Sequence, residues 1–282
     1  MKQMIPHNTP NERGTTMIEL LIALVLTGIV TLAIMQTYVT QHESYLVQDD
    51  VTVMQQSARA SIDELTRHIR MAGHNTPIGL PAIEAANTNP DTIVITYHGN
   101  DCDTYLSAPM PNTSAELKCG KDVSCFEVNQ WVYIYEPDSA VGEWFKISWV
   151  QQEAQDGHIQ HRYVTKMFSR QYGADALILA LNRIKFYIDN TTDSANPTLM
   201  IQSEFEPPQP YADHVIDLQF QYRLTNGDVV DEPVLISDVR EVLIAVTTES
   251  TLEASQRADA ETPQDVKTRT YTSSVHMRNI DI

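Results

Sequence analysis

The hydrophobic pattern of the chain begins with a long apolar stretch near the N-terminus. From Leu20 to Met35 no residue is charged, and only Thr27, Gly28 and Thr31 interrupt the apolar side chains. At a rise of 1.5 Å per residue, a helix over residues 15–40 is about 39 Å long, which is enough to cross a bilayer. We therefore expect residues 15–40 to form a transmembrane helix.

A second helical pattern follows directly, with a single apolar face. Between Val47 and Ala72 apolar residues recur at steps of three and four, and the positions between them are mostly polar or charged. Gly73 suits the position just after a helix, and the basic residues before it suit a helix C-terminus. Together the patterns predict one helix over residues 15–73, amphipathic over 41–73. The residues of its apolar face are Val47, Val51, Met54, Ala58, Ile62, Leu65, Ile69 and Ala72.

After Pro81 the pattern changes to short runs of β-branched and aromatic residues separated by turn residues. Asn226-Gly227 between two of these runs predicts a tight β-hairpin. The expected fold class is α+β, with a long N-terminal α-helix packed on a β-rich, antiparallel domain over residues 74–282. The expected strand runs are residues 91–99, 130–137, 143–152, 158–168, 181–189, 198–206, 214–224, 228–236, 239–249 and 268–280.

Three polar segments are expected to be loops. Residues 100–123 contain two of the three cysteines, residues 190–213 contain four prolines, and residues 250–265 are acidic and rich in alanine.

Composition narrows the possible partners of this domain. The chain has 282 residues, of which 42% are hydrophobic and 20% charged, so one or two domains with ordinary cores are expected. The formal net charge of -18 argues against nucleic acid or anionic lipid as the main partner of the surface. Because the acidic residues are spread along the chain, they are typical of the solvated surface of a secreted domain.

The cysteines favour a disulfide over a metal site. Cys102, Cys119 and Cys125 form no C-x-x-C motif, and no histidine pair at zinc-finger spacing follows them. A disulfide in an oxidising compartment leaves one thiol over. Cys119 and Cys125 bracket a segment suited to a hairpin loop, so we favour their pairing, although Cys102 can take either partner instead.

The sequence lacks the motifs of common enzyme classes, including G-x-S-x-G, H-E-x-x-H and G-x-x-x-x-G-K-[ST]. His158 and His161 are three apart in a strand-like run, so they point to opposite faces and are poor partners for a metal. The acidic residues Asp228, Asp231 and Glu232 lack the spacing of a calcium loop. We expect no catalytic residue, no cofactor and no metal site, and therefore no enzyme.

The three tryptophans lie in or beside strand-like runs. We expect them to be core or sheet-face residues rather than a binding platform. These residues are Trp131, Trp144 and Trp149.

Two features distinguish the apolar stretch from a signal peptide or a plain anchor: basic residues flank it on one side only, and an acidic residue lies inside it. Lys2 and Arg13 precede the stretch, which keeps the N-terminus cytoplasmic. No small-x-small cleavage site follows, as a secretory signal would require. Glu19 lies just inside the stretch, where a carboxylate costs roughly 3 kcal/mol in hydrocarbon. A plain membrane anchor has no use for this residue.

The segment "RGTTMIELLIALVL" at residues 13–26 resembles the class III signal of type IV prepilins and pseudopilins. The resemblance implies a pilin-like fold and a leader peptide at residues 1–14. It also implies that a prepilin peptidase cuts after Gly14 and methylates Thr15. The family usually has phenylalanine or another apolar residue where this chain has Thr15. In such filaments the residue matching Glu19 faces the N-terminal amine of a neighbouring subunit, which implies an assembly role.

Later segments resemble the PilW-type minor pilins, with the J-type pseudopilins of type II secretion as near relatives. The resemblance implies a non-catalytic, low-abundance subunit that initiates or caps a type IV pilus. Its implied partners are the prepilin peptidase, other major and minor pilins, the inner-membrane assembly platform and the membrane itself. The implied location is the cytoplasmic membrane, with a periplasmic C-terminal domain that joins the pilus or its tip. The matching segments are residues 54–75, 91–99, 183–189 and 268–280.

Two alternatives remain open. One is a type II secretion pseudopilin, which forms a short periplasmic filament. The other is a membrane-tethered periplasmic binding or adhesion module that does not polymerise.

Overall fold

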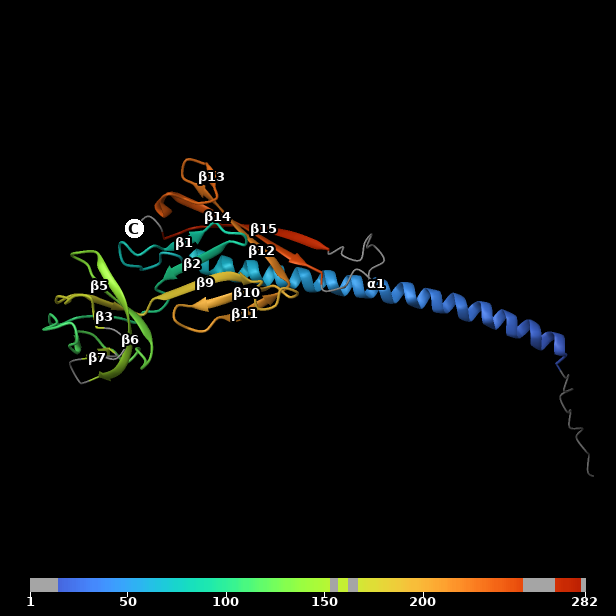
Figure 1. The fold of residues 1–282 in the computed structure, drawn as a ribbon, viewed down its shortest axis with the longest axis horizontal. Helices are drawn as coiled ribbons and strands as arrows, with labels where there is room; N and C mark the ends of the chain where they lie inside the picture. The colour runs from blue at the N-terminus through green and yellow to red at the C-terminus, as the bar shows by residue number, and fades with distance from the viewer. Residues whose placement is uncertain (1–14, 153–156, 162–166, 251–266, 280–282) are drawn as a thin grey trace, which may run out of the picture. The chain divides into compact units, whose positions relative to one another are not determined.

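The structure is a computed structural model that describes residues 15–152, 157–161, 167–250 and 267–279. In this part of the chain one long helix, α1 (Met17–Met71), precedes every strand (Figure 1). The strands pair antiparallel, so the expected α+β fold class is confirmed. The expected leader at 1–14, most of the expected loop at 250–265 and residues 162–166 of the expected strand at 158–168 lie outside the described residues.

Helix α1 contains 55 residues and belongs to two compact units. Its turns up to Asp50 belong to the smaller unit, and its turns from Val51 onward belong to the larger unit with the sheets. In the larger unit Met54, Ala58 and Leu65 are buried, in agreement with the predicted apolar face.

The helix ends at a glycine that no other residue could replace without strain. Gly73 has φ +76°, the left-handed conformation common just after a helix. A Cβ at this position would lie 2.5 Å from the carbonyl oxygen of Asn279, so the close approach of the two segments also requires glycine. The Gly73 amide donates to the carbonyl of Thr96 at 3.0 Å, which ties the helix end to strand β2 (Thr92–Tyr97).

Two antiparallel sheets contribute to the core around the later turns of α1. The first has five strands in the order β1-β2-β9-β10-β11, and the second has four in the order β13-β12-β14-β15. The strands of the first are β1 (Ile83–Ala86), β2, β9 (Asn182–Asp189), β10 (Thr198–Ser203) and β11 (Gln209–Asp213). Those of the second are β12 (Val215–Leu224), β13 (Val229–Val230), β14 (Val239–Glu249) and β15 (Thr268–His276), with a short 3-10 helix η1 (Ile236–Asp238) before β14.

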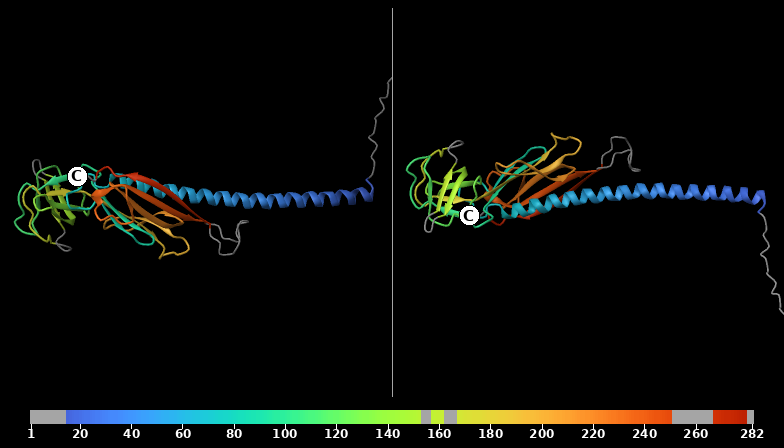
Figure 2. Two further views of the ribbon diagram at one scale, coloured as in Figure 1. Left: turned by 90° about the horizontal axis from the view of Figure 1, so that it is seen from above. Right: turned by 90° about the horizontal axis from the view of Figure 1, so that it is seen from below.

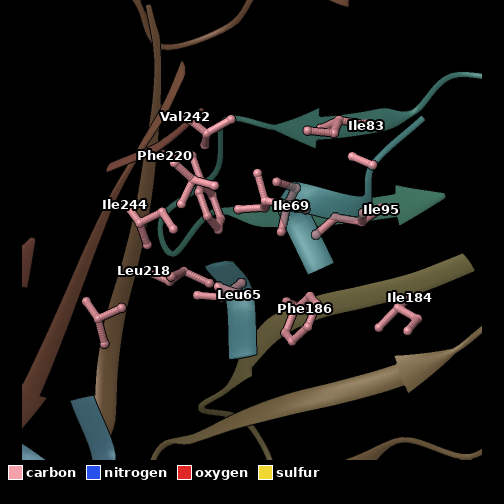
Figure 3. Packing of buried hydrophobic residues seen from close by; sticks show 14 of the residues in the cluster. Leu65, Ile69, Ile83, Ile95, Ile184, Phe186, Leu218, Phe220, Val242 and Ile244 are labelled. Carbon is pink, nitrogen blue, oxygen red and sulfur yellow. The ribbon is translucent and has the colours of Figure 1, made fainter. Parts of the chain in front are cut away.

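Both sheets bury apolar side chains against the helix. The later turns of α1 run alongside strands of both sheets in Figures 1 and 2. Figure 3 shows Leu65 and Ile69 of α1 among Phe186 of the first sheet and Leu218 and Phe220 of the second. A fully buried side chain of this size stabilises a fold by about 1.5–3 kcal/mol, so the cluster holds helix and sheets together.

The predicted hairpin at Asn226-Gly227 is confirmed. Strands β12 and β13 pair antiparallel on either side of it. Gly227 has φ +93°, which glycine adopts without steric cost. The turn is further stabilised because the side-chain oxygen of Asn226 accepts a hydrogen bond from the Asp228 amide at 2.9 Å.

A third sheet has six strands and its own core. Its order is β3-β8-β5-β6-β7-β4, and its core contains Val132, Ile134, Phe145, Ile147 and Ile159. Its strands are β3 (Asp103–Tyr105), β4 (Leu117–Cys119), β5 (Trp131–Glu136), β6 (Val141–Gln152), β7 (Gly157–His161) and β8 (Leu177–Leu179). The sequence pattern did not indicate that the strands divide among three sheets.

Two of the expected loops contain strands, so those expectations were wrong in part. Residues 100–123 contain β3 and β4. Residues 190–213 contain β10, which agrees with the expected strand run at 198–206, and β11, which was not expected. Strands β3 and β4 have three residues each, which is too short to show an alternating pattern. Strand β11 contains Pro210, and it is an edge strand, where a missing N–H is tolerated.

The favoured disulfide was wrong: Cys102 pairs with Cys125, and Cys119 is a free, buried thiol. Cys119 lies at the end of β4, where its pairing with Gly157 of β7 turns the side chain into the six-stranded sheet's core. The segment after it is no hairpin loop, because the next strand along the chain, β5, pairs with β6 and β8 and not with β4. Burial raises the pKa of the Cys119 thiol to about 12, so it carries little reactive thiolate.

We expect non-reducing peptide mapping of the purified full chain to find a Cys102–Cys125 cross-link and an unmodified Cys119. Replacing both bridged cysteines by serine should lower the free energy of unfolding by about 3 kcal/mol, because the bridge closes a loop with a sequence separation of 23 residues. Cys119→Ala is the matched control and should leave the cross-link intact. A Cys119–Cys125 peptide in the map would contradict the structure.

A buried histidine joins α1 to the first sheet. His68 is 6% exposed, and its Nδ1 lies 3.0 Å from the hydroxyl of Tyr97 on β2. Its Nε2 lies 3.0 Å from Oε1 of Glu64, one helical turn earlier. Burial lowers the pKa of His68, and the hydrogen bond and charge of Glu64 oppose this only in part. The ring is therefore neutral in the folded state near neutral pH.

This burial predicts a loss of stability in acid. Because the pKa of folded His68 lies below its unfolded value of about 6.5, its contribution is fully present above that pH and is lost as the pH falls through the folded pKa. We expect the difference in unfolding free energy between the wild type and His68→Gln to shrink on acidification. Chemical denaturation of the full chain in detergent at several pH values measures this, and a constant difference would contradict the assignment.

Candidate assembly site at the start of the long helix

The first turn of α1 is closed by a reciprocal pair of side chains. The Thr16 amide donates to Oε2 of Glu19 at 2.8 Å, and the Thr16 hydroxyl donates to the same oxygen at 3.0 Å. In return the Glu19 amide donates to the Thr16 hydroxyl oxygen at 3.4 Å. This is a capping box, T-x-x-E, in which two orphan amides of the helix start are satisfied by side chains. Its signature was present in the sequence and was not used to predict the helix start.

The capping geometry leaves part of the carboxylate available. All of the hydrogen bonds that Glu19 accepts from the described residues go to Oε2. Oε1 therefore remains able to accept from a donor outside this chain. A cation beside it would recover part of the free energy that a carboxylate loses in a medium of low dielectric constant.

The helix beyond Glu19 presents an apolar surface on all sides. Among Leu20–Met35 the large apolar side chains are exposed by 53–72% in the isolated chain. The hydroxyls of Thr27 and Thr31 donate to the carbonyls of Ala23 and Thr27, four residues before each. Since each hydroxyl proton is satisfied within the helix, these residues add little polarity to the surface. By length and composition α1 can cross a membrane.

The structure places two of the three residues expected to be processed or to act in assembly. Thr15 directly precedes the capping residue, and Glu19 lies in the first turn. Gly14 lies outside the described residues. Thr15 and Glu19 are thus brought to the same end of the helix, four positions apart, ahead of the apolar surface.

The other candidate residues found in the sequence do not gather into a site. His158 lies 2.8 Å from Glu116, whereas His161 packs against the ring of Phe168 with centroids 4.3 Å apart. The acidic residues near the hairpin make hydrogen bonds to nearby residues. Asp231, for example, accepts one from the side-chain amide of Gln221 at 3.0 Å. Within the described ranges no group of three His, Cys, Asp or Glu residues is arranged to hold a metal ion.

Comparison with known proteins also points to the start of the long helix. Residues 9–35 match the prokaryotic N-terminal methylation motif. No curated protein and no solved structure matches the chain. The matched residues include Gly14, Thr15 and Glu19. They support a protein of the type IV pilin or pseudopilin type, processed by a prepilin peptidase and anchored in the membrane by its N-terminal helix.

Proposed function

We propose that this chain is a minor pilin, a non-catalytic subunit that initiates or caps a type IV pilus. The observation that carries the proposal is that the methylation motif and the exposed apolar part of the helix occupy the same residues. The methylation motif covers residues 9–35, and from Met17 onward the same residues form a helix whose apolar side chains are exposed. Such a surface needs an apolar environment, either lipid or the helices of other subunits.

The size of the folded part favours few copies in the filament. The described residues after α1 form three sheets with two large cores. A subunit this bulky is hard to repeat along a thin filament, whereas one or a few copies fit at an end. We infer that the β-rich part lies in the periplasm before assembly and on the pilus afterwards.

We infer that Glu19 serves assembly by pairing with the N-terminal amine of a neighbouring subunit. Cleavage after Gly14 would create such an amine on every processed subunit. The geometry supports separate roles for the two carboxylate oxygens. Oε2 caps its own helix, whereas Oε1 accepts no hydrogen bond from the described residues and can accept one from a neighbour. Glu19 can then bind a neighbour without giving up the cap.

Processing gives the first test of this proposal. When the chain is expressed with its native peptidase, we expect the mature protein to begin at N-methylated Thr15. Mass spectrometry of the N-terminal peptide measures both features. Gly14→Leu should leave the precursor uncut, because a bulky residue replaces the glycine before the cut. A mature start near residue 40 would identify an ordinary signal peptide instead.

Assembly gives the second test, and Glu19→Gln separates charge from capping. Glutamine retains a side-chain oxygen for the capping box, so the helix start and membrane insertion should be unchanged. The neighbour's amine would lose its anionic partner, and breaking a buried pair costs about 3–5 kcal/mol. We therefore expect little or none of this variant in sheared filaments. Glu19→Val should fail in the same way.

Thr16→Ala is the matched control for that experiment. It weakens the cap by about 1 kcal/mol but keeps the carboxylate, so it should still enter filaments. The measurement is immunodetection in sheared pili at equal membrane levels of each variant. Unchanged incorporation of Glu19→Gln would exclude the pairing role. If the wild type is also absent from sheared pili, the minor-pilin proposal fails, and the two alternatives that remain are the pseudopilin and the membrane tether.

A further inference from the structure

The face of the five-stranded sheet turned away from the helix carries a hollow of about 520 Å³. Its floor consists of small or short side chains, among them Ala86, Thr92 and Val94, from neighbouring strands β1 and β2. Because the alternate residues of these strands are buried on the other face, the floor is rigidly held by the core. A hollow of this size is in the range of small-molecule sites.

The charged side chains that line the hollow balance one another. Arg183 Nη2 donates to both carboxylate oxygens of Glu84 at 2.9 Å, and Arg183 Nη1 donates to Glu204. Lys185 is the other cation of the lining, and its Nζ lies 4.8 Å from the centre of the Tyr187 ring. The lining therefore holds two acidic and two basic residues, and the guanidinium is already bound by two carboxylates.

An aromatic wall closes one end of the hollow. Phe205 lines it, is 46% exposed and has φ +64°, a left-handed conformation that is rare for a bulky residue. Its ring stacks on Trp131 with centroids 3.8 Å apart, and Trp144 meets it edge-on at 5.9 Å. Both tryptophans line a smaller hollow of about 180 Å³ that shares Arg183 and Glu204 with the first. A strained backbone that is held by its neighbours suggests a functional constraint.

We infer that this hollow binds a neutral saccharide, with one sugar ring packed against Phe205. Sugar rings offer an apolar C–H face to an aromatic ring and hydroxyls that both donate and accept. The lining supplies matching groups, since Glu84 accepts, Lys185 donates and the Gln202 amide does both. A small number of polar groups around an apolar floor is the usual composition of a ligand site.

The same features argue against other ligand classes. An anion would find Lys185 as the lining's cation without a carboxylate partner among the described residues, but it would lie beside the carboxylates of Glu84 and Glu204, and Arg183 is already bound by both of them. A metal cation would have to displace Arg183 from the same carboxylates. A wholly apolar ligand would cover the charges without offering them hydrogen bonds, which costs free energy for each group.

We would test this with the full chain in a detergent that has no sugar headgroup. The probes are three trisaccharides that differ in charge: triacetylchitotriose, which is neutral, trigalacturonate and the unacetylated glucosamine trimer. The indole N–H signals of Trp131 and Trp144 should shift on adding the neutral trimer at millimolar concentration, and that of Trp149, on β6 outside both hollows, should not. Absence of these shifts, or equal shifts with the acidic or the basic trimer, would overturn the inference.

Substitutions inside and outside the hollow test whether the saccharide that causes the shifts is bound there. Phe205→Ala should weaken binding of the neutral trimer at least tenfold. Gln202→Ala, which removes a polar group of the lining and its hydrogen bond to the Glu206 carbonyl, should weaken it several-fold. Tyr211→Ala removes an aromatic ring that is 41% exposed on β11 outside the hollow, and it should leave binding unchanged. Retained binding in both hollow variants would place the saccharide elsewhere and overturn the inference. The outcome is independent of filament assembly, because it is measured on the isolated chain.

Discussion

The contact of Leu65 and Ile69 with two sheets at once is the interaction on which the larger unit depends. Both residues are completely buried, and the only other helix among the described residues is the three-residue η1, whose Ile236 packs against the same core. Without α1 the inner faces of both sheets would be exposed to water. The same helix continues without a break toward the N-terminus, so the element that completes the core also carries the apolar segment. Loss of the core contacts would therefore detach the sheets from the helix that carries the apolar segment.

In the first turn of the helix, the Glu19 carboxylate both caps the helix start and keeps one oxygen free of hydrogen bonds from the described residues. A helix start in an apolar medium leaves amides that water cannot satisfy, and the Thr16–Glu19 pair meets that need within the chain. The resulting geometry occupies one oxygen of Glu19 and leaves the other accessible. An acidic residue at this position is thus useful to the isolated chain, because it satisfies amides of the helix start that an apolar medium leaves without partners.

The elements with a long, regular pattern could be predicted from the sequence. The helix was expected over residues 15–73 and runs from Met17 to Met71, and the Asn226-Gly227 hairpin was predicted from two residues. The residues proposed for processing and assembly could be named from the sequence because they lie in one contiguous segment, which also matches the N-terminal methylation motif. Pairings between distant segments were not predictable in the same way. The choice of Cys102 over Cys119 depends on which face of β4 is buried, and the His68–Tyr97 contact joins residues 29 positions apart.

The hydroxyl bonds inside the apolar part of α1 have a consequence for how the helix changes surroundings. Thr27, Thr31 and Thr37 each donate to a carbonyl four residues earlier, so none of their protons needs an external acceptor. The segment can therefore exchange lipid chains for neighbouring helices without stripping bound water from these groups. Exchange between lipid and helices would then be governed by how closely the surrounding groups pack against the apolar side chains.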